Sequence, residues 1–208
     1  MKKIILITAM TLLSLMAIAQ NNDSGAVMEM IDNDVTTFLG IPVDGKKDDM
    51  MLELIKKKGF KPRSTGYGLE YLQGVFNGQD VMVIIATYRN KVYRVYIQEN
   101  NAHSAGDIKL HYNNLVRQFE NNQNYIEPDK DQTIPDDVNI SDEMISHEKK
   151  FIAEFYQKNK KMELSNVVVN GLNFQNKKVW FMISRHGENY YIAMYYDNLW
   201  NMPNGEDL

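Results

Sequence analysis

A β-hairpin pattern that occurs twice constrains the fold of this chain more than any other feature. The first copy spans residues 80–98, DVMVIIATYRNKVYRVYIQ, and the second spans residues 178–196, KVWFMISRHGENYYIAMYY. A shift of 98 residues (179 minus 81) superimposes Val81 on Val179, and the apolar, turn and aromatic positions then coincide. Alternating side chains on both sides of a short turn predict two antiparallel strands in each copy. The repetition predicts two related sheet units.

Short turns fix the register that we expect within each hairpin. The first hairpin is expected to turn at Arg89-Asn90, and a two-residue turn is expected in the second. The second hairpin should then pair its residues as Arg185 with Tyr190, Ile183 with Ile192 and Phe181 with Met194.

Helix signals precede each hairpin. Gly59 is expected to end the first helix in a left-handed conformation, with Phe60 supplying the accompanying hydrophobic contact. Ser104 and Asp107 fit a variant of the capping box that opens the second helix. The order of elements predicts an α+β fold of two tandem units, each a helix plus an antiparallel β-meander, with helices packed on one face of the sheet. The expected helices span 46–58, 104–121 and 141–158, and further strands are expected at 35–41, 69–76 and 167–174.

Amphipathic stripes predict which sides of the later helices are buried. Ser141 is expected to cap the third helix, and Glu148 falls inside the apolar stripe of that helix without an evident reason. The stripes are Ile108, Tyr112, Leu115 and Phe119 on the second helix, and Ile145, Phe151, Ile152, Phe155 and Tyr156 on the third.

The first nineteen residues have the layout of a secretory signal peptide. Two lysines, an apolar run and the small residues of Ala17-Ile18-Ala19 follow one another in the expected order. We therefore expect an exported bacterial protein, periplasmic or extracellular, with no membrane span after signal cleavage. The expected organisation is a signal peptide at 1–19, a flexible lead-in at 20–30, a first α+β unit at 31–122, a linker at 123–140 and a second unit at 141–208.

One local pattern carries a resemblance to a known group of proteins. Residues 38–45, FLGIPVDG, are followed by a Met- and Leu-rich helix that ends at Lys58-Gly59-Phe60 and then by a β-meander. This run resembles small exported bacterial proteins of uncharacterised function whose tandem units have a fold like that of the β-lactamase inhibitor protein. The resemblance implies a sheet with one open face that can hold another macromolecule. The cysteines of the inhibitor are absent here, so its specific activity is not implied.

Composition excludes several classes of function. The chain has no cysteine, which excludes disulfides, thiol catalysis and cysteine-ligated zinc. Its 27 acidic and 23 basic residues are scattered and give a net charge of −4, whereas nucleic-acid binding requires a clustered basic face. Motifs for nucleotide or dinucleotide cofactors are absent, and Ser184 with His186 lacks an acid that would orient the histidine. We therefore expect a non-enzymatic protein without a cofactor; an unrecognised hydrolase or metal enzyme is the least supported alternative.

One face of the hairpins is a candidate binding surface. Period-two alternation predicts that Trp180, Met182, Tyr191 and Tyr195 share a face, and these residue types are enriched at protein interfaces. Burial under helices, or packing of the two units on each other, would be a structural explanation of the same pattern. A protein, peptide or envelope component is the expected partner; the alternative is a small molecule or lipid in an apolar cleft between the units. The expected binding residues are Tyr93, Trp180, Met182, Tyr191 and Tyr195, and the same face of the first hairpin is expected to carry Met82, Ile84, Ala86, Tyr93, Val95 and Ile97.

Two sets of side chains have spacings that occur in metal sites. His103, Asp107 and His111 are four residues apart along the second helix, as metal ligands on a helix are, but His103 lies at or before its cap. Glu127, Asp129 and Asp131 alternate in the linker and could hold calcium. A solvated helix flank and a solvated acidic linker are the ordinary explanations of the two sets. We therefore assign no metal from the sequence.

Overall fold

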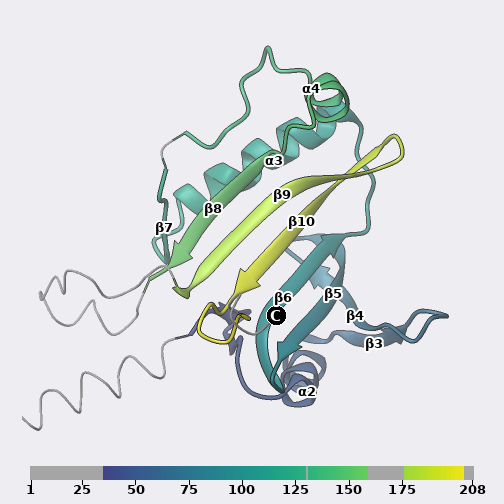
Figure 1. The fold of residues 1–208 in the computed structure, drawn as a ribbon, viewed down its shortest axis with the longest axis vertical. Helices are drawn as coiled ribbons and strands as arrows, with labels where there is room; N and C mark the ends of the chain where they lie inside the picture. The colour runs from purple at the N-terminus through teal and green to yellow at the C-terminus, as the bar shows by residue number, and fades with distance from the viewer. Residues whose placement is uncertain (1–34, 130, 159–175, 204–208) are drawn as a thin grey trace, which may run out of the picture. The chain divides into compact units, whose positions relative to one another are not determined.

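The computed structural model describes residues 35–129, 131–158 and 176–203 of the chain. These residues have an α+β fold with a large antiparallel sheet (Figure 1). No helix among them is long and apolar enough to cross a membrane. The helices are α2 (Lys47–Lys58), α3 (Ala105–Glu120) and α4 (Ile140–Ser146); the strands are β1 (Thr37–Phe38), β2 (Ile41–Pro42), β3 (Lys61–Ser64), β4 (Glu70–Phe76), β5 (Gln79–Tyr88), β6 (Lys91–Glu99), β7 (Tyr125–Ile126), β8 (Ile152–Gln157), β9 (Lys178–His186) and β10 (Asn189–Asp197).

Eight of the described strands form one sheet in the order β3-β4-β5-β6-β10-β9-β8-β7. All neighbours are antiparallel, and β6 pairs with β10 at the centre. The two predicted hairpins are confirmed as β5–β6 and β9–β10. Arg89 and Asn90 both have positive φ, as a tight hairpin turn requires. The predicted register of the second hairpin is also confirmed: Arg185 pairs with Tyr190, Ile183 with Ile192 and Phe181 with Met194.

A β-bulge in β6 overturns part of the predicted face of the first hairpin. Ala86 pairs with Arg94, and the extra residue, Tyr93, has no partner in β5. The residues that follow are therefore shifted by one position relative to the prediction. Val95 and Ile97, predicted to share a face with Ala86, lie on the opposite side of the sheet and are buried.

Both longer helices contribute to one hydrophobic core on one side of the sheet. The predicted stripe of α3 is confirmed as buried, and the Tyr112 ring meets the Phe181 ring of β9 edge-on at 5.3 Å. In Figure 1, α3 lies behind β8 and β9, and α2 lies by the end of β5. The predicted helix ends are confirmed as well: Gly59 is left-handed (φ 75°), and Ser104 accepts a hydrogen bond from the Asp107 amide.

The predicted third helix at 141–158 is wrong beyond its first two turns. α4 ends at Ser146, its cap is Asn139 rather than Ser141, and β8 follows. Residues spaced by four can share a helix face, but residues spaced by two and four also share a strand face. Pairing with β9 selects the strand and buries Ala153 and Phe155. Glu148 therefore lies in a loop rather than in an apolar stripe.

The strands before β4 also differ from the prediction. The expected strand at 35–41 is split into β1 and β2 by a turn at Leu39-Gly40, where both residues have positive φ. Edge strand β3 was not predicted, because its four residues are all exposed and lack apolar alternation. The expected signal peptide, the lead-in and the expected strand at 167–174 lie outside the described residues.

A buried asparagine ties the segment between α3 and α4 to the core. The Asn113 side chain of α3 accepts a hydrogen bond from the Ile134 amide at 2.7 Å and donates one to the Ile134 carbonyl at 2.8 Å. Both residues are buried. The two bonds satisfy the backbone N–H and C=O groups of Ile134, which lies in a segment with little secondary structure of its own.

Replacing Asn113 by alanine is expected to lower the free energy of unfolding by about 2 kcal/mol, because two buried backbone groups lose their partner. Chemical denaturation followed by circular dichroism measures this change. Asn114→Ala is the matched control, since Asn114 is the next residue of α3 and is exposed. Equal losses in the two variants would contradict the structural role of Asn113.

Candidate functional site

The side of the sheet opposite the helices carries a row of aromatic side chains, which we call the aromatic face. The register places Tyr96 of β6 opposite Tyr195 of β10, and Tyr195 opposite Trp180 of β9. These three side chains are partly exposed, whereas their sequence neighbours Val179 and Tyr196 are buried on the helix side. Other partly exposed members of the aromatic face are Met82 and Ile84 of β5, Gln98 of β6, Met182 and Ser184 of β9, and Tyr191 of β10.

The centre of the aromatic face is a stacked pair of rings. Trp180 and Tyr195 are nearly parallel, with ring centroids 3.8 Å apart and an angle of 8° between the planes. Tyr96 lies on the other side of Tyr195 from Trp180, and its ring centroid is 5.1 Å from that of Tyr195. Neighbouring strands bring the rings together, and each ring restricts the rotation of the next. The three rings form a continuous aromatic surface across β6, β10 and β9.

A buried carboxylate fixes the orientation of this surface. Asp197, whose side chain is 2% exposed, binds Arg94 through two hydrogen bonds of 2.6 and 2.8 Å. The Trp180 indole N–H donates to the same carboxylate at 2.8 Å. The Arg94 guanidinium lies 5.1 Å from the Tyr195 ring centroid and 5.6 Å from that of Trp180. Its hydrogen bond to Asp197 raises the pKa of Arg94, so the guanidinium stays charged.

Tyr96 and Tyr195 carry no charge of their own. Burial, and then the nearby Tyr195, raises the pKa of Tyr96 to about 12. Burial also raises the pKa of Tyr195. The Tyr96 hydroxyl donates a hydrogen bond to the Gln98 side chain. The hydroxyls therefore act as neutral donors and acceptors at the rim of an apolar surface.

Four of the five residues predicted from the sequence lie together on the aromatic face: Trp180, Met182, Tyr191 and Tyr195. Tyr93, the fifth, is the bulged residue, and its ring lies 5.9 Å from the Arg94 guanidinium. Sequence reasoning missed Tyr96, Arg94 and Asp197. Their place depends on the bulge and on the pairing of β6 with β10, and no local pattern signals either.

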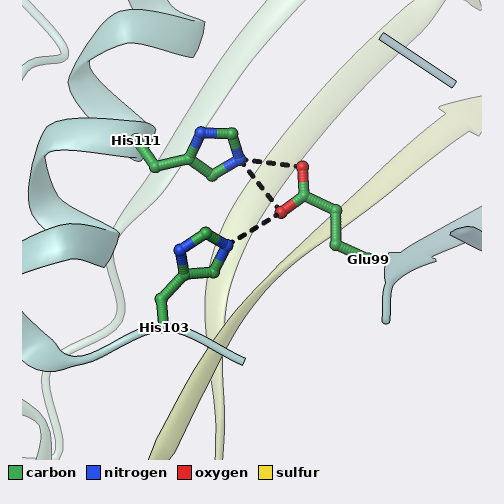
Figure 2. Close-up of side chains that lie close together, drawn as sticks. All are labelled: Glu99, His103 and His111. Carbon is green, nitrogen blue, oxygen red and sulfur yellow. Dashed lines mark hydrogen bonds and ion pairs between the residues drawn. The ribbon is translucent and has the colours of Figure 1, made fainter. Parts of the chain in front are cut away.

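A second cluster lies on the helix side of the sheet and contains two histidines and a glutamate (Figure 2). His111 Nε2 lies 2.8 and 2.9 Å from the two carboxylate oxygens of Glu99, and His103 Nε2 lies 3.6 Å from one of them. The two imidazoles are stacked, with centroids 4.9 Å apart and planes at 16°. The hydrogen bond to Glu99 raises the pKa of His111, and burial opposes this rise.

The predicted metal-type spacings are only partly reproduced. Asp107 is not in the histidine cluster: its carboxylate accepts a hydrogen bond from the Ser104 hydroxyl at the start of α3. Glu99, the last residue of β6, takes the place expected for Asp107. Among the described residues, the linker acids Glu127, Asp129 and Asp131 form no group with converging ligand atoms.

Comparisons of the chain with protein-family models, with curated proteins and with solved structures found no match.

Proposed function

We propose that this chain is an exported, non-enzymatic binding protein whose aromatic face holds a segment of another protein. The partner segment is uncharged and presents aromatic or aliphatic side chains. The observation that carries this proposal is the stacked pair of Trp180 and Tyr195, which is partly exposed yet fixed by Asp197. Export is supported by the signal-like layout of residues 1–19.

The fixed aromatic rings favour binding for an energetic reason. A side chain that must be immobilised on association costs about 0.5–1.5 kcal/mol. Trp180 and Tyr195 are already held by their stack and by the Asp197 carboxylate, so little of this cost remains. Large aromatic side chains with one polar tip are also the types that dominate protein interfaces.

The charges on the aromatic face favour an uncharged partner. Arg94 is neutralised by Asp197, and Lys178 of β9 is neutralised by Glu154 of β8. Both ion pairs lie within the face, so neither cation is free to attract a phosphate or an acidic segment. An apolar centre with internally paired charges is complementary to an uncharged apolar segment.

The alternative, a small molecule or lipid in a cleft between the two units, receives less support. Such a cleft would separate the hairpins, whereas β6 is paired directly with β10 over Arg94–Gln98. The aromatic row crosses this junction without interruption. We therefore favour a broad, exposed surface as the binding site.

The proposal includes a tandem origin for the two halves of the sheet. In the part of the chain that the structure describes, each half runs from a helix into four strands, α2 into β3–β6 and α3 into β7–β10, with α4 inserted in the second. The strand order is symmetrical about the β6–β10 pair. Two such units joined edge to edge supply a wider face than either unit alone. The resemblance to proteins with a fold like that of the β-lactamase inhibitor protein stays a prediction.

Selection from a phage library of random linear peptides on the purified protein tests the binding function. Selected peptides are expected to be rich in aromatic and aliphatic residues and poor in charge. Replacing Trp180 by alanine is expected to weaken their binding about 30-fold, which corresponds to the about 2 kcal/mol of an interface hot spot. Isothermal titration calorimetry with a selected peptide measures this loss.

Trp200→Ala is the matched control, because Trp200 is 54% exposed but lies after β10 in the chain, outside the aromatic face. This variant is expected to bind the peptides as the wild-type protein does. Peptides that bind Trp180→Ala undiminished would overturn the proposal. Binding of a fluorescent fatty acid in place of peptides, with a loss in Trp180→Ala, would favour the lipid alternative instead.

A further inference from the structure

We propose that Glu99, His103 and His111 form a binding site for a divalent transition-metal ion of the zinc type. Two imidazole nitrogens and one carboxylate oxygen are a ligand set that proteins use for zinc. The three ligand atoms lie within 4.8 Å of one another. Glu99 belongs to the helix side of the sheet, so this site is separate from the aromatic face and does not depend on the proposed binding function.

The distances suit a metal after small side-chain movements. Metal–nitrogen and metal–oxygen bonds of about 2.0–2.1 Å in a tetrahedral site separate the ligand atoms by about 3.3 Å. His111 Nε2 and Glu99 Oε1 are now 2.8 Å apart, and His103 Nε2 and Glu99 Oε2 are 3.6 Å apart. The first separation has to open and the second to close by a few tenths of an ångström, and the two imidazole nitrogens, which lie within 4.8 Å of each other, have to lie about 3.3 Å apart around the ion. Figure 2 shows both histidine rings turning a nitrogen toward the carboxylate.

His103 supplies an independent indication of a missing partner. Its Nε2 atom is buried and makes no hydrogen bond. The 3.6 Å separation from Glu99 is within ion-pair range but too long for a hydrogen bond. Leaving such a buried atom without a partner destabilises the fold. A metal ion between the two histidines and Glu99 would give this nitrogen a ligand bond.

A simple ion pair explains only part of the cluster. A protonated His111 paired with Glu99 accounts for the two short contacts between them. It leaves His103 Nε2 without a hydrogen-bond partner, although the His103 ring is stacked on that of His111 with centroids 4.9 Å apart. Two neutral imidazoles and a carboxylate around a divalent ion satisfy all three groups at once.

The backbone holds the three ligands on different elements. Glu99 ends β6 and pairs with Val81 of β5, while His111 lies in the second turn of α3. His103 forms an isolated β-bridge with Tyr190 of β10 through backbone hydrogen bonds of 2.9 and 3.1 Å. Ligands on rigid elements need little reorganisation when the metal binds.

The side chains of the site are partly exposed, although His103 Nε2 itself is buried. The side chains of Glu99, His103 and His111 are 11%, 18% and 22% exposed. Three protein ligands fill three of the four positions of a tetrahedral ion, so water or a ligand atom of another molecule can take the fourth.

Titration calorimetry of the tag-free, metal-stripped protein with Zn²⁺ tests the inference, and the absorption spectrum with Co²⁺ reports the coordination geometry. One Zn²⁺ per chain is expected, with Co²⁺ bands of a four-coordinate site and reversal of both by EDTA. Losing one direct ligand is expected to weaken binding by more than the about 10–100-fold that loss of an outer-shell partner costs. The variants are Glu99→Gln, His103→Ala and His111→Ala.

His147→Ala is the matched control, because His147 also lies near a carboxylate, 3.8 Å from Asp142, but its side chain is 62% exposed. It is expected to retain full affinity. Glu99→Gln keeps the shape of the side chain, and circular dichroism with peptide binding confirms that each variant is folded. No stoichiometric binding, or equal losses in His147→Ala and His111→Ala, would overturn the metal site and leave the aromatic-face proposal unaffected.

Discussion

Replacing Phe181 by alanine is expected to lower the free energy of unfolding by about 4 kcal/mol, within the range for deletion of a buried phenylalanine ring. Phe181 is fully buried on the helix side of β9. Its ring centroid lies 5.3 Å from that of Tyr112, 5.6 Å from that of Phe119 and 6.1 Å from that of Phe155. Three rings from two other elements would face the resulting cavity, and urea denaturation measures the cost.

Met182 provides a control one residue away. Its side chain is partly exposed on the aromatic face, so Met182→Ala is expected to cost about 1 kcal/mol or less, close to the value for surface substitutions. A large difference between the two variants would support a sheet with one buried and one accessible side. If Met182→Ala costs as much as Phe181→Ala, the aromatic face is itself buried, and the proposed binding site fails.

The sheet could be predicted where its determinants are local. The turn at Arg89-Asn90 and the alternation on both sides of it define a hairpin within twenty residues. The caps at Gly59 and Ser104 are also local, because each depends on residues within one helical turn. These predictions are confirmed because no distant pairing is needed to decide them.

Features that depend on distant pairing could not be predicted. Residues 151–157 alternate in a way that fits a strand and a helix alike, and only the neighbouring β9 decides between the two. The bulge at Tyr93 moves Val95 and Ile97 to the opposite side of the sheet from the predicted one. A single unpaired residue reverses every assignment that follows it in the strand.

The residues of the two sites also fall into those that local sequence predicts and those that only distant pairing places. Trp180 and Tyr195 could be placed together because they share one hairpin, but Arg94 and Tyr96 reach them only through the pairing of β6 with β10. The spacing of His103 and His111 signalled a possible metal site. The glutamate that completes the cluster comes from the preceding strand, and helical spacing alone pointed to the wrong acid.

Replacing Asp197 by alanine is expected to lower the free energy of unfolding by about 3 kcal/mol, because it leaves Arg94 without its partner in a partly buried site. The same change releases the Trp180 indole and so is expected to weaken peptide binding as well. Arg94→Ala combined with Asp197→Ala is expected to cost less than the sum of the two single changes, since no unpaired charge remains.

The second ion pair of the aromatic face provides the comparison that isolates this effect. Glu154 and Lys178 are more exposed, with side chains 36% and 24% accessible, so Glu154→Ala is expected to cost at most about 1 kcal/mol. Denaturation and peptide titration separate the two roles of Asp197. Both measurements use Asp197→Ala, Arg94→Ala, the double variant and Glu154→Ala. If Asp197→Ala proves no more costly than Glu154→Ala and binds peptides normally, the carboxylate does not organise the aromatic face. Binding would then depend on the ring stack alone.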